Sequence, residues 1–262
     1  MKRTLITGGT GNLGKVIVSL LSKKEFEISV LTSKSNLPDS DRANYVKGDL
    51  TKKESLVKLK DKFDVIIHCA SNALDSDAID VKGSQNLLDT VLHDKLEHFI
   101  YISIVGVDKD TNNYYQDKTR VENMVKESNL PCTIIRATQF HDLVLESIIK
   151  PIDKGNGKKL LVPKNLRFQS IDKKDVAKKV YEAIKKGPSN KTTNIGGPEI
   201  PTLDKMLDTY LTLSKQAKIT ESVAPYNDLQ NIFTTGINLC PDNKYGAITW
   251  NDYLNNVINN NI

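Results

Sequence analysis

Short apolar segments alternate with segments of helical periodicity along most of the chain. Six of them have the length and composition of strands: Thr4 to Ile6, Glu27 to Leu31, Ala43 to Val46, Val65 to Cys69, Phe99 to Ser103 and Cys132 to Arg136. Apolar residues at helical spacing predict helices between them, near Thr51 to Leu59, Ile79 to Leu92 and Tyr115 to Glu127. Strands that alternate with helices through short connections predict a parallel sheet covered on both faces.

After about Arg136 the pattern becomes less regular. It predicts helices at Phe140 to Lys150, Asp172 to Lys185, Leu203 to Leu213, Asp228 to Phe233 and after Thr249, a turn at Gly155 to Gly157, and short strands at Leu160 to Val162, Arg167 to Ile171 and Thr193 to Ile195. We therefore expect an α/β protein with a Rossmann-type doubly wound parallel sheet in residues 1–137. Residues 138–262 are expected to form a smaller C-terminal substrate lobe that partly returns to the core, so that the whole counts as one domain or two.

A glycine-rich turn lies directly between the first strand and the first helix. It reads Thr7-Gly8-Gly9-Thr10-Gly11-Asn12-Leu13-Gly14 and fits the spacing of dinucleotide-binding turns. Glycines in such a turn let the backbone approach a pyrophosphate, and the following helix N-terminus attracts its charge. The alternative is a turn that only joins a strand to a helix. With both elements in place we predict a cofactor site that includes Gly8, Thr10, Gly11, Asn12, Leu13 and Gly14.

The end of the second strand bears on the choice of nucleotide. NAD enzymes of this type usually carry an acidic residue there, whereas this chain has Ser33 and Lys34, which suit a 2′-phosphate. NADP is therefore the predicted cofactor, with NAD as the alternative. The other interpretation of Lys34 is that it is one of many surface lysines and contacts no phosphate. The predicted site is completed by Asp49 and Leu50 near the adenine, and by Cys69, Ala70 and Ser71 after the fourth strand. Asp49 fits equally well as an ordinary turn residue.

Candidate catalytic residues follow the fifth strand. Tyr114 and Lys118 are spaced so that they share one helical face, and a nearby cation lowers the pKa of a phenol and favours proton transfer. Ser103, at the end of the fifth strand, is a candidate donor to the same substrate oxygen. Tyr115 has Lys118 three residues on, so spacing leaves the choice between the tyrosines open, and an ordinary amphipathic helix start is the alternative. Gln139, Phe140 and His141 are predicted to line the substrate pocket, although a lone histidine there is as often structural.

Composition excludes several classes of protein. The 37 basic and 32 acidic residues are interleaved, without the basic stripe of a nucleic-acid-binding protein. The four histidines show no metal-ligand spacing, and the three widely separated cysteines, Cys69, Cys132 and Cys240, fit free thiols in a reducing compartment. We see neither a leader segment nor an apolar run long enough to cross a bilayer. The expectation is a cytoplasmic protein with a small-molecule substrate, no metal, and no nucleic-acid or membrane partner.

Several of these segments together resemble the NmrA-like group of atypical short-chain dehydrogenases/reductases. The matching residues are Thr7 to Gly14, Tyr101 to Gly106, Tyr114 to Lys118 with Glu122, Arg136 to His141, Asn194 to Pro198, and Trp250 with Tyr253 and Leu254. The resemblance implies a monomer or homodimer that binds NAD(P)(H), with Lys118 at the nicotinamide ribose and Ser103 and Tyr114 as catalytic groups. Ser33 departs from the pattern, because several relatives have an arginine there for the 2′-phosphate.

The resulting hypothesis is an NAD(P)H-dependent reductase of a small carbonyl, enone or quinone compound. The main alternative is an NADP-sensing regulatory protein without turnover, because some members of the group lack the tyrosine. The presence of Tyr114 and Lys118 favours the enzyme. A nucleotide-sugar epimerase ranks last, because the region after the sixth strand leaves limited room for a sugar nucleotide.

Overall fold

The computed structural model describes residues 1–35, 41–60, 62–91, 95–109, 112–154 and 159–259. The predicted turn at Gly155 to Gly157 lies outside these ranges. The chain divides into two compact units, one formed by Met1–Arg136 with Ala177–Thr193 and the other by Ala137–Val176 with Asn194–Ile262.

A seven-stranded sheet forms the centre of the first unit in the described part of the chain, and all six predicted strands are present in it. The strands are β1 (Lys2–Thr7), β2 (Phe26–Thr32), β3 (Asn44–Lys47), β4 (Val65–His68), β5 (His98–Ile104), β6 (Cys132–Ala137) and β8 (Thr192–Ile195), in the order β3-β2-β1-β4-β5-β6-β8. Strand β1 pairs in parallel with both β2 and β4, so the strand order reverses at this point of the sheet. Ligands of doubly wound sheets bind at the carboxyl ends of the strands at such a reversal. The predicted α/β Rossmann-type fold is confirmed.

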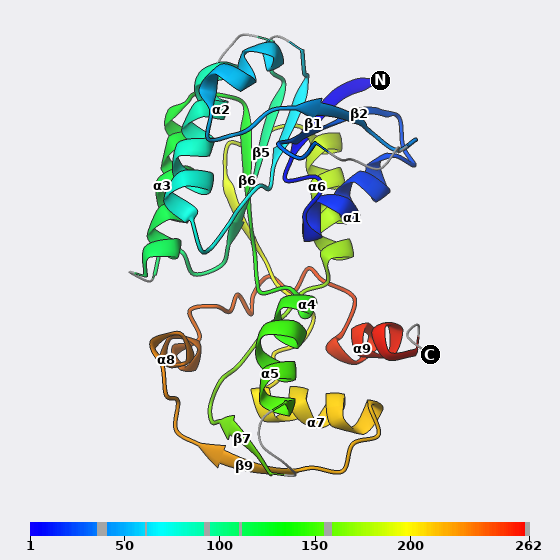
Figure 1. The fold of residues 1–262 in the computed structure, drawn as a ribbon, viewed down its shortest axis with the longest axis vertical. Coiled ribbons are helices and arrows are strands. Elements are labelled where there is room, and N and C mark those ends of the chain that lie inside the picture. Colours follow the sequence, from blue (N-terminus) through cyan, green and yellow to red (C-terminus); the bar gives the residue numbers. More distant parts are fainter. Residues whose placement is uncertain (36–40, 61, 92–94, 110–111, 155–158, 260–262) are drawn as a thin grey trace. The chain divides into compact units, whose positions relative to one another are not determined.

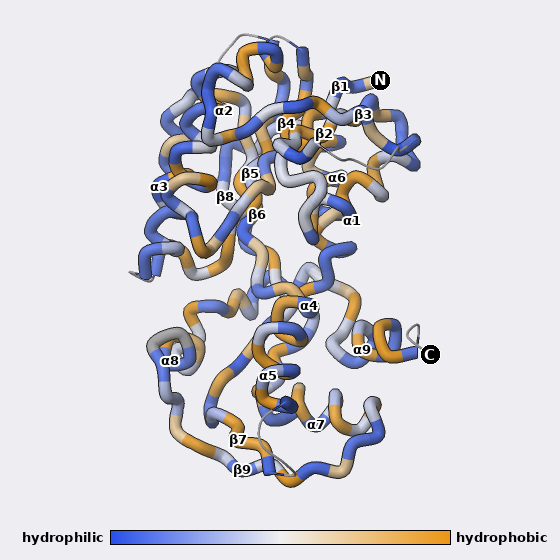
Figure 2. Tube along the Cα trace, in the orientation of Figure 1, coloured by the Kyte–Doolittle hydropathy of each residue, from blue (hydrophilic) through white to orange (hydrophobic). Residues whose placement is uncertain are grey.

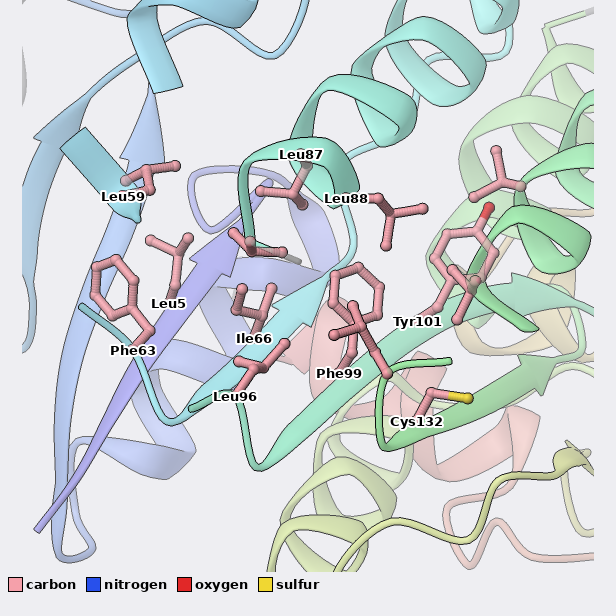
Figure 3. Packing of buried hydrophobic residues seen from close by; sticks show 14 of the residues in the cluster. Leu5, Leu59, Phe63, Ile66, Leu87, Leu88, Leu96, Phe99, Tyr101 and Cys132 are labelled. Carbon is pink, nitrogen blue, oxygen red and sulfur yellow. The ribbon is translucent and has the colours of Figure 1, made fainter. Parts of the chain in front are cut away.

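Helices cover both faces of this sheet (Figure 1). Helices α2 (Gly83–Val91) and α3 (Asn113–Glu127) lie on one face, and α1 (Asn12–Leu21) lies on the other with the part of α6 (Lys173–Lys186) that belongs to this unit. Hydrophobic residues are concentrated in the strands (Figure 2). Between the sheet and the helices α2 and α3, the residues Leu5, Ile66, Leu87, Phe99 and Tyr101 belong to one buried cluster (Figure 3). This packing gives the carboxyl ends of the strands a rigid base.

Two predicted helices of the first unit have local geometry that the periodicity did not indicate. The segment near Thr51 to Leu59 is a 3-10 helix, η1 (Lys53–Leu59). The helix that was expected to begin near Ile79 starts as a π-helical segment, η2 (Asp77–Lys82), which continues into α2. Single π-turns are rare and occur often at functional sites, and this one contains the buried residue Asp80.

The second unit has its own apolar core. The helices and strands of this unit, in chain order, are α4 (His141–Val144), η3 (Leu145–Ile149), α5 (Lys150–Asp153), β7 (Lys159–Pro163), α7 (Leu203–Leu213), β9 (Ile219–Val223), α8 (Asp228–Thr235) and α9 (Trp250–Asn259). Strands β7 and β9 pair in parallel, and β9 was not predicted because its residues are mostly exposed. Trp250 and Phe168 are among the buried residues of this core.

Two predictions for the second unit were wrong. The helix that begins at α4 does not stop before Pro151, because the proline lies in the first turn of α5, where the missing N–H costs little. Residues Arg167 to Ile171 do not form a regular strand; they make isolated bridges from Arg167 to Thr202 and from Ile171 to Phe140. Within the described residues, no helix is both long enough and apolar enough to cross a membrane.

Candidate cofactor and active site

The glycine-rich turn after β1 is packed too tightly for side chains at three positions. At Gly9 a Cβ would lie 2.7 Å from the Val30 side chain, and at Gly8 and Gly14 it would meet backbone atoms. Gly8 has a φ of +68°, and a Cβ there would lie 2.7 Å from the backbone of Ala70. A Cβ at Gly14 would lie 2.1 Å from the carbonyl oxygen of Gly8, so the helix and the turn touch directly. Gly11 is different: its backbone is extended, and a Cβ there would lie 3.1 Å from the same oxygen. Gly8 and Gly14 are therefore needed by the turn itself, whereas Gly11 is an exposed glycine at its mouth.

The first turn of α1 is suited to an anion. Gly11 is the N-cap and provides no side-chain hydrogen bond, and the first turn contains no acidic residue. Asn12 is exposed and Thr10 is half-buried, while the Leu13 side chain is packed in the core, so Leu13 offers only its backbone. Backbone N–H groups and the helix dipole are what a pyrophosphate requires at this place. The residues present fit a dinucleotide.

Two lysines lie at the carboxyl ends of β2 and β3. Ser33 and Lys34 are exposed directly after β2, as predicted. The sequence reasoning missed Lys47, which is paired with Thr32 in the parallel register of β2 and β3. Its Nζ donates to the Ser33 carbonyl at 2.5 Å and to Ser35 Oγ at 3.1 Å. Two cations therefore flank the segment where a 2′-phosphate was expected.

The remaining predicted cofactor residues lie near the ends of β3 and β4, and several have structural partners. Asp49 Oδ1 accepts hydrogen bonds from Thr51 Oγ1 at 2.8 Å and from Thr51 N at 3.0 Å, which hold its pKa below the usual value. This geometry favours the turn-residue interpretation. The Leu50 carbonyl accepts from Asn86 Nδ2 at 2.8 Å. Cys69 Sγ donates to the Thr7 carbonyl at 3.0 Å, and Ala70 borders Gly8.

Helix α3 carries the predicted catalytic pair. It begins two residues earlier than predicted, because Asn112 caps it by accepting a hydrogen bond from Tyr115 N at 3.0 Å. Tyr114 is half-buried, Tyr115 is 5% exposed, and Lys118 Nζ lies 5.8 Å from the centroid of the Tyr114 ring. The structure therefore makes Tyr114 the more accessible of the two tyrosines.

The Lys118 ammonium is buried against a carboxylate that the sequence analysis missed. Its Nζ lies 2.9 Å from Asp80 Oδ1, and the two side chains are 4% and 1% exposed. Burial by itself lowers the pKa of Lys118, but Tyr101, Tyr114 and Asp80 outweigh this effect and raise it. Asp77 and Asp80 both lie in the first turn of this helix, so the sequence does not show which of them meets Lys118.

Tyr114 is connected to the same carboxylate through a serine. Its hydroxyl lies 2.9 Å from Ser71 Oγ, which in turn donates to Asp80 Oδ1 at 2.7 Å. The backbone N–H of Asn72 donates to the other oxygen of Asp80 at 2.9 Å. Tyr114, Ser71, Asp80 and Lys118 thus form one hydrogen-bonded group.

Ser103, the third predicted catalytic residue, is engaged elsewhere. It is 2% exposed and donates to Glu122 Oε1 at 2.6 Å. The same carboxylate accepts two hydrogen bonds of 2.7 Å from Arg136, whose guanidinium also lies 2.7 Å from Asp108 Oδ2. Burial by itself lowers the pKa of Arg136, and Glu122 and Asp108 raise it well above its usual value. While this arrangement stands, the Ser103 proton is used to hold Glu122.

The three predicted substrate-pocket residues belong to the second unit. His141 is 1% exposed; its Nδ1 lies 2.8 Å from Ser170 Oγ, and its Nε2 lies 3.0 Å from the Ile248 carbonyl. Gln139 is 7% exposed and its Oε1 accepts from Asn238 Nδ2 at 3.3 Å, while Phe140 is the N-cap of α4. These contacts favour the structural interpretation of His141. In the described ranges, no group of three metal-ligating side chains is present.

Comparison with known proteins agrees with the glycine-rich turn and the sheet. A family model described as NAD(P)H-binding matches residues 8–187. The photosystem II assembly factor Ycf39 of Trieres chinensis is 25% identical over 202 residues, which are 74% of this chain and 63% of that protein. An isoflavone reductase-like protein of Olea europaea is 23% identical over 167 residues, which are 57% of this chain and 52% of that protein. The matches thus span less than two thirds of the length of these relatives.

Solved structures share the fold over nearly the whole chain. UDP-glucuronic acid 4-epimerase of Bacillus cereus, solved with NAD, has a TM-score of 0.76 at 16% identity and covers 99% of this chain and 100% of its own. dTDP-glucose 4,6-dehydratase of Bacillus anthracis, also solved with NAD, has a TM-score of 0.76 at 18% identity and covers 99% and 96%. At these identities the likeness concerns the fold alone. The family match, which spans most of the chain, confirms the resemblance drawn from the sequence: the protein is a member of the NAD(P)H-binding family of atypical short-chain dehydrogenases/reductases.

Proposed function

We propose that the protein is an NADPH-dependent reductase of a small carbonyl, enone or quinone compound. The observation that carries this proposal is the position of Tyr114 and Lys118 on one face of α3, with the tyrosine half-buried and the lysine charge behind its ring. A protein that only senses the nucleotide needs the glycine-rich turn but not this pair.

The cofactor is proposed to bind with its pyrophosphate at the first turn of α1, against the backbone of Gly11 and Asn12. NADP is preferred in this proposal because Lys34 and Lys47 provide positive charge at the carboxyl ends of β2 and β3, and because the end of β2 lacks the acidic residue that is usual in NAD enzymes. When bound, the reduced nicotinamide supplies a hydride. The protein has to orient the carbonyl compound, exclude water and provide a proton.

Tyr114 is the proposed proton donor. A phenol hydroxyl gives its proton to the oxygen of the substrate as negative charge develops there, which is general acid catalysis. Lys118 contributes a buried positive charge on the same helix face, next to the ring of Tyr114. Ser103 is left out of this step because its proton is held by Glu122.

The test starts from a panel of quinones, enones, aldehydes and ketones with NADPH oxidation as the signal. On an aldehyde or ketone, Tyr114→Phe is expected to slow reduction by about 10²–10⁴-fold, the usual effect of a positioned acid. Its affinity for NADPH should be unchanged, because only one hydroxyl is lost. Tyr115→Phe is the matched control and should reduce the rate little. Loss of rate in Tyr115→Phe with full rate in Tyr114→Phe would show that the wrong tyrosine was chosen.

A second function, an NADP-binding regulatory protein without turnover, is favoured by one observation. The ammonium of Lys118 is already paired with Asp80, so it is less available to a ribose than the family pattern implies. Relatives named as photosystem II assembly factors are consistent with a role in binding another protein. Tight NADPH binding together with no oxidation by any compound of the panel, in wild type and in Tyr114→Phe alike, would favour this function.

A further inference from the structure

The hydrogen bonds around Ser71 have a defined direction. A serine hydroxyl has one proton, and that of Ser71 is donated to Asp80 Oδ1, which is a pure acceptor when ionised. The 2.9 Å contact between Ser71 Oγ and the Tyr114 hydroxyl therefore has Tyr114 as its donor. In the resting protein the proton of Tyr114 points toward Ser71.

Asp80 is held so that it stays in place when Ser71 turns. It accepts from Lys118 Nζ at 2.9 Å and from the backbone N–H of Asn72 at 2.9 Å, in addition to Ser71. Its side chain is 1% exposed, whereas Ser71 is exposed. Asp80 thus remains paired without the serine proton, and Ser71 has access to water.

We propose that Ser71 relays a proton from solvent to Tyr114, and that Asp80 is the positioning residue that holds both Ser71 and Lys118. This inference rests on the proposed reductase function. The Ser71 hydroxyl first turns from Asp80 toward Tyr114, so that the Tyr114 proton is directed to the substrate. As the substrate oxygen takes the proton of Tyr114, the tyrosine oxygen takes the proton of Ser71, and the oxygen of Ser71 takes one from a water molecule, which leaves hydroxide to the solvent. The transfers are concerted, so no serine alkoxide accumulates. One solvent proton is consumed for each carbonyl group that receives a hydride.

The relay explains why the serine lies between the tyrosine and a carboxylate. If Tyr114 donated directly to Asp80, the carboxylate would have no proton to return to the tyrosine oxygen after the substrate had been protonated. With Ser71 between them, one rotation of a hydroxyl reverses the direction of the hydrogen bond from Tyr114. Hydrogen bonds to an ionised group are the stronger ones, which fixes the resting orientation.

The first arm of the test measures turnover of para-nitrobenzaldehyde by NADPH in Ser71→Ala, Ser71→Thr and Ser76→Ala. Ser76 is the matched control, because its hydroxyl donates to Asp117 of α3 at 2.6 Å without belonging to the relay. We expect Ser71→Ala to lower kcat by about 10–10²-fold and to increase the solvent deuterium isotope effect, because proton delivery becomes slower. The rate is compared at saturating NADPH, and the Kd for NADPH is measured in parallel because Ser71 also belongs to the predicted cofactor site. Ser71→Thr should restore most of the rate, and Ser76→Ala should lower thermal stability without changing the isotope effect.

The second arm does not require turnover. Tyrosines labelled with carbon-13 at the ζ carbon are observed by NMR, and the Tyr114 signal is the one that Tyr114→Phe removes. Ser71→Ala and Asp80→Asn should shift this signal, and Ser76→Ala should leave it in place. An unmoved signal, or a fully active Ser71→Ala with an unchanged isotope effect, would overturn the relay. If the signal shifts as expected while no carbonyl compound is reduced, the hydrogen-bonded group stands and the proposed reductase function falls.

Discussion

The carboxylate of Glu122 lies at the centre of a buried group of charged and polar side chains in the first unit. It is fully buried, and it accepts one hydrogen bond from Ser103 and two from the Arg136 guanidinium, whose side chain is 9% exposed. Lys126 Nζ lies 3.6 Å from the same carboxylate. Replacing Glu122 with glutamine keeps the size of the side chain but puts an amide, with two N–H donors, where the guanidinium needs an acceptor. Arg136 would then keep one hydrogen bond to the amide oxygen, with Asp108, which is 46% exposed, as its carboxylate partner.

The expected cost follows from this geometry. Removing one partner of a buried ion pair typically destabilises a protein by about 3–5 kcal/mol, because the other charge stays buried. Since Asp108 still faces Arg136, we expect Glu122→Gln to lower the free energy of unfolding by about 2–4 kcal/mol. The measurement is urea unfolding followed by far-UV circular dichroism, because the single tryptophan, Trp250, reports on the second unit.

Glu127→Gln is the matched control for this experiment. It makes the same chemical change five residues further along α3, at a position that is exposed. A surface change of this kind is expected to alter the free energy of unfolding by less than about 0.5 kcal/mol. Equal effects of the two substitutions would refute the reasoning, because they would show that the buried ion pair contributes no more than a surface charge. NADPH affinity should be the same in both variants.

Three further predictions concern binding and pH. Gly11→Val should abolish NADPH binding but leave the protein folded. The extended backbone of Gly11 accepts a β-branched residue, and the new side chain fills the mouth of the turn. An unchanged NADPH affinity in calorimetry would contradict the proposed site. Lys34→Glu should weaken NADPH binding by about 1–3 kcal/mol and leave NADH nearly unaffected, and Lys47→Ala should act in the same direction; equal losses for both cofactors would show that neither lysine meets a 2′-phosphate. Burial lowers the pKa of His98 to about 4, below its ordinary value of 6.5, so the unfolded chain binds more protons between these values and stability falls as the pH drops from 6.5 to 4. His98 contributes at most about 1.4 kcal/mol per pH unit to this slope, and His68, whose pKa burial also lowers to about 4, adds its own contribution. The slope should therefore become smaller in His98→Asn, without vanishing, when urea unfolding is repeated across the range.

The periodicity of the sequence predicted the sheet well because its central strands are buried on both faces. Continuous apolar segments such as Val65 to His68 have no other stable place than the centre of a covered parallel sheet. Strand β9 escaped prediction for the opposite reason, since Ile219–Val223 is largely exposed and its pairing with β7 depends on a neighbour far away in sequence. Pro151 shows the same limit, because its position in the first helical turn is a tertiary matter.

In the candidate site, too, the sequence predicted the local features and missed the contacts between distant segments. The glycine-rich turn and the spacing of Tyr114 and Lys118 are local, because one turn and one helix face determine which atoms meet, and the sequence by itself was sufficient to predict them. The partners of these side chains are not local. Asp80 reaches Lys118 only through a π-turn and the packing of η2 on α3, and Glu122 reaches Ser103 and Arg136 only because α3 lies across β5 and β6. The tertiary structure therefore decided to which carboxylate each hydroxyl donates its proton. The physical reason is that a buried charge needs a partner, and the fold determines which side chains lie next to it.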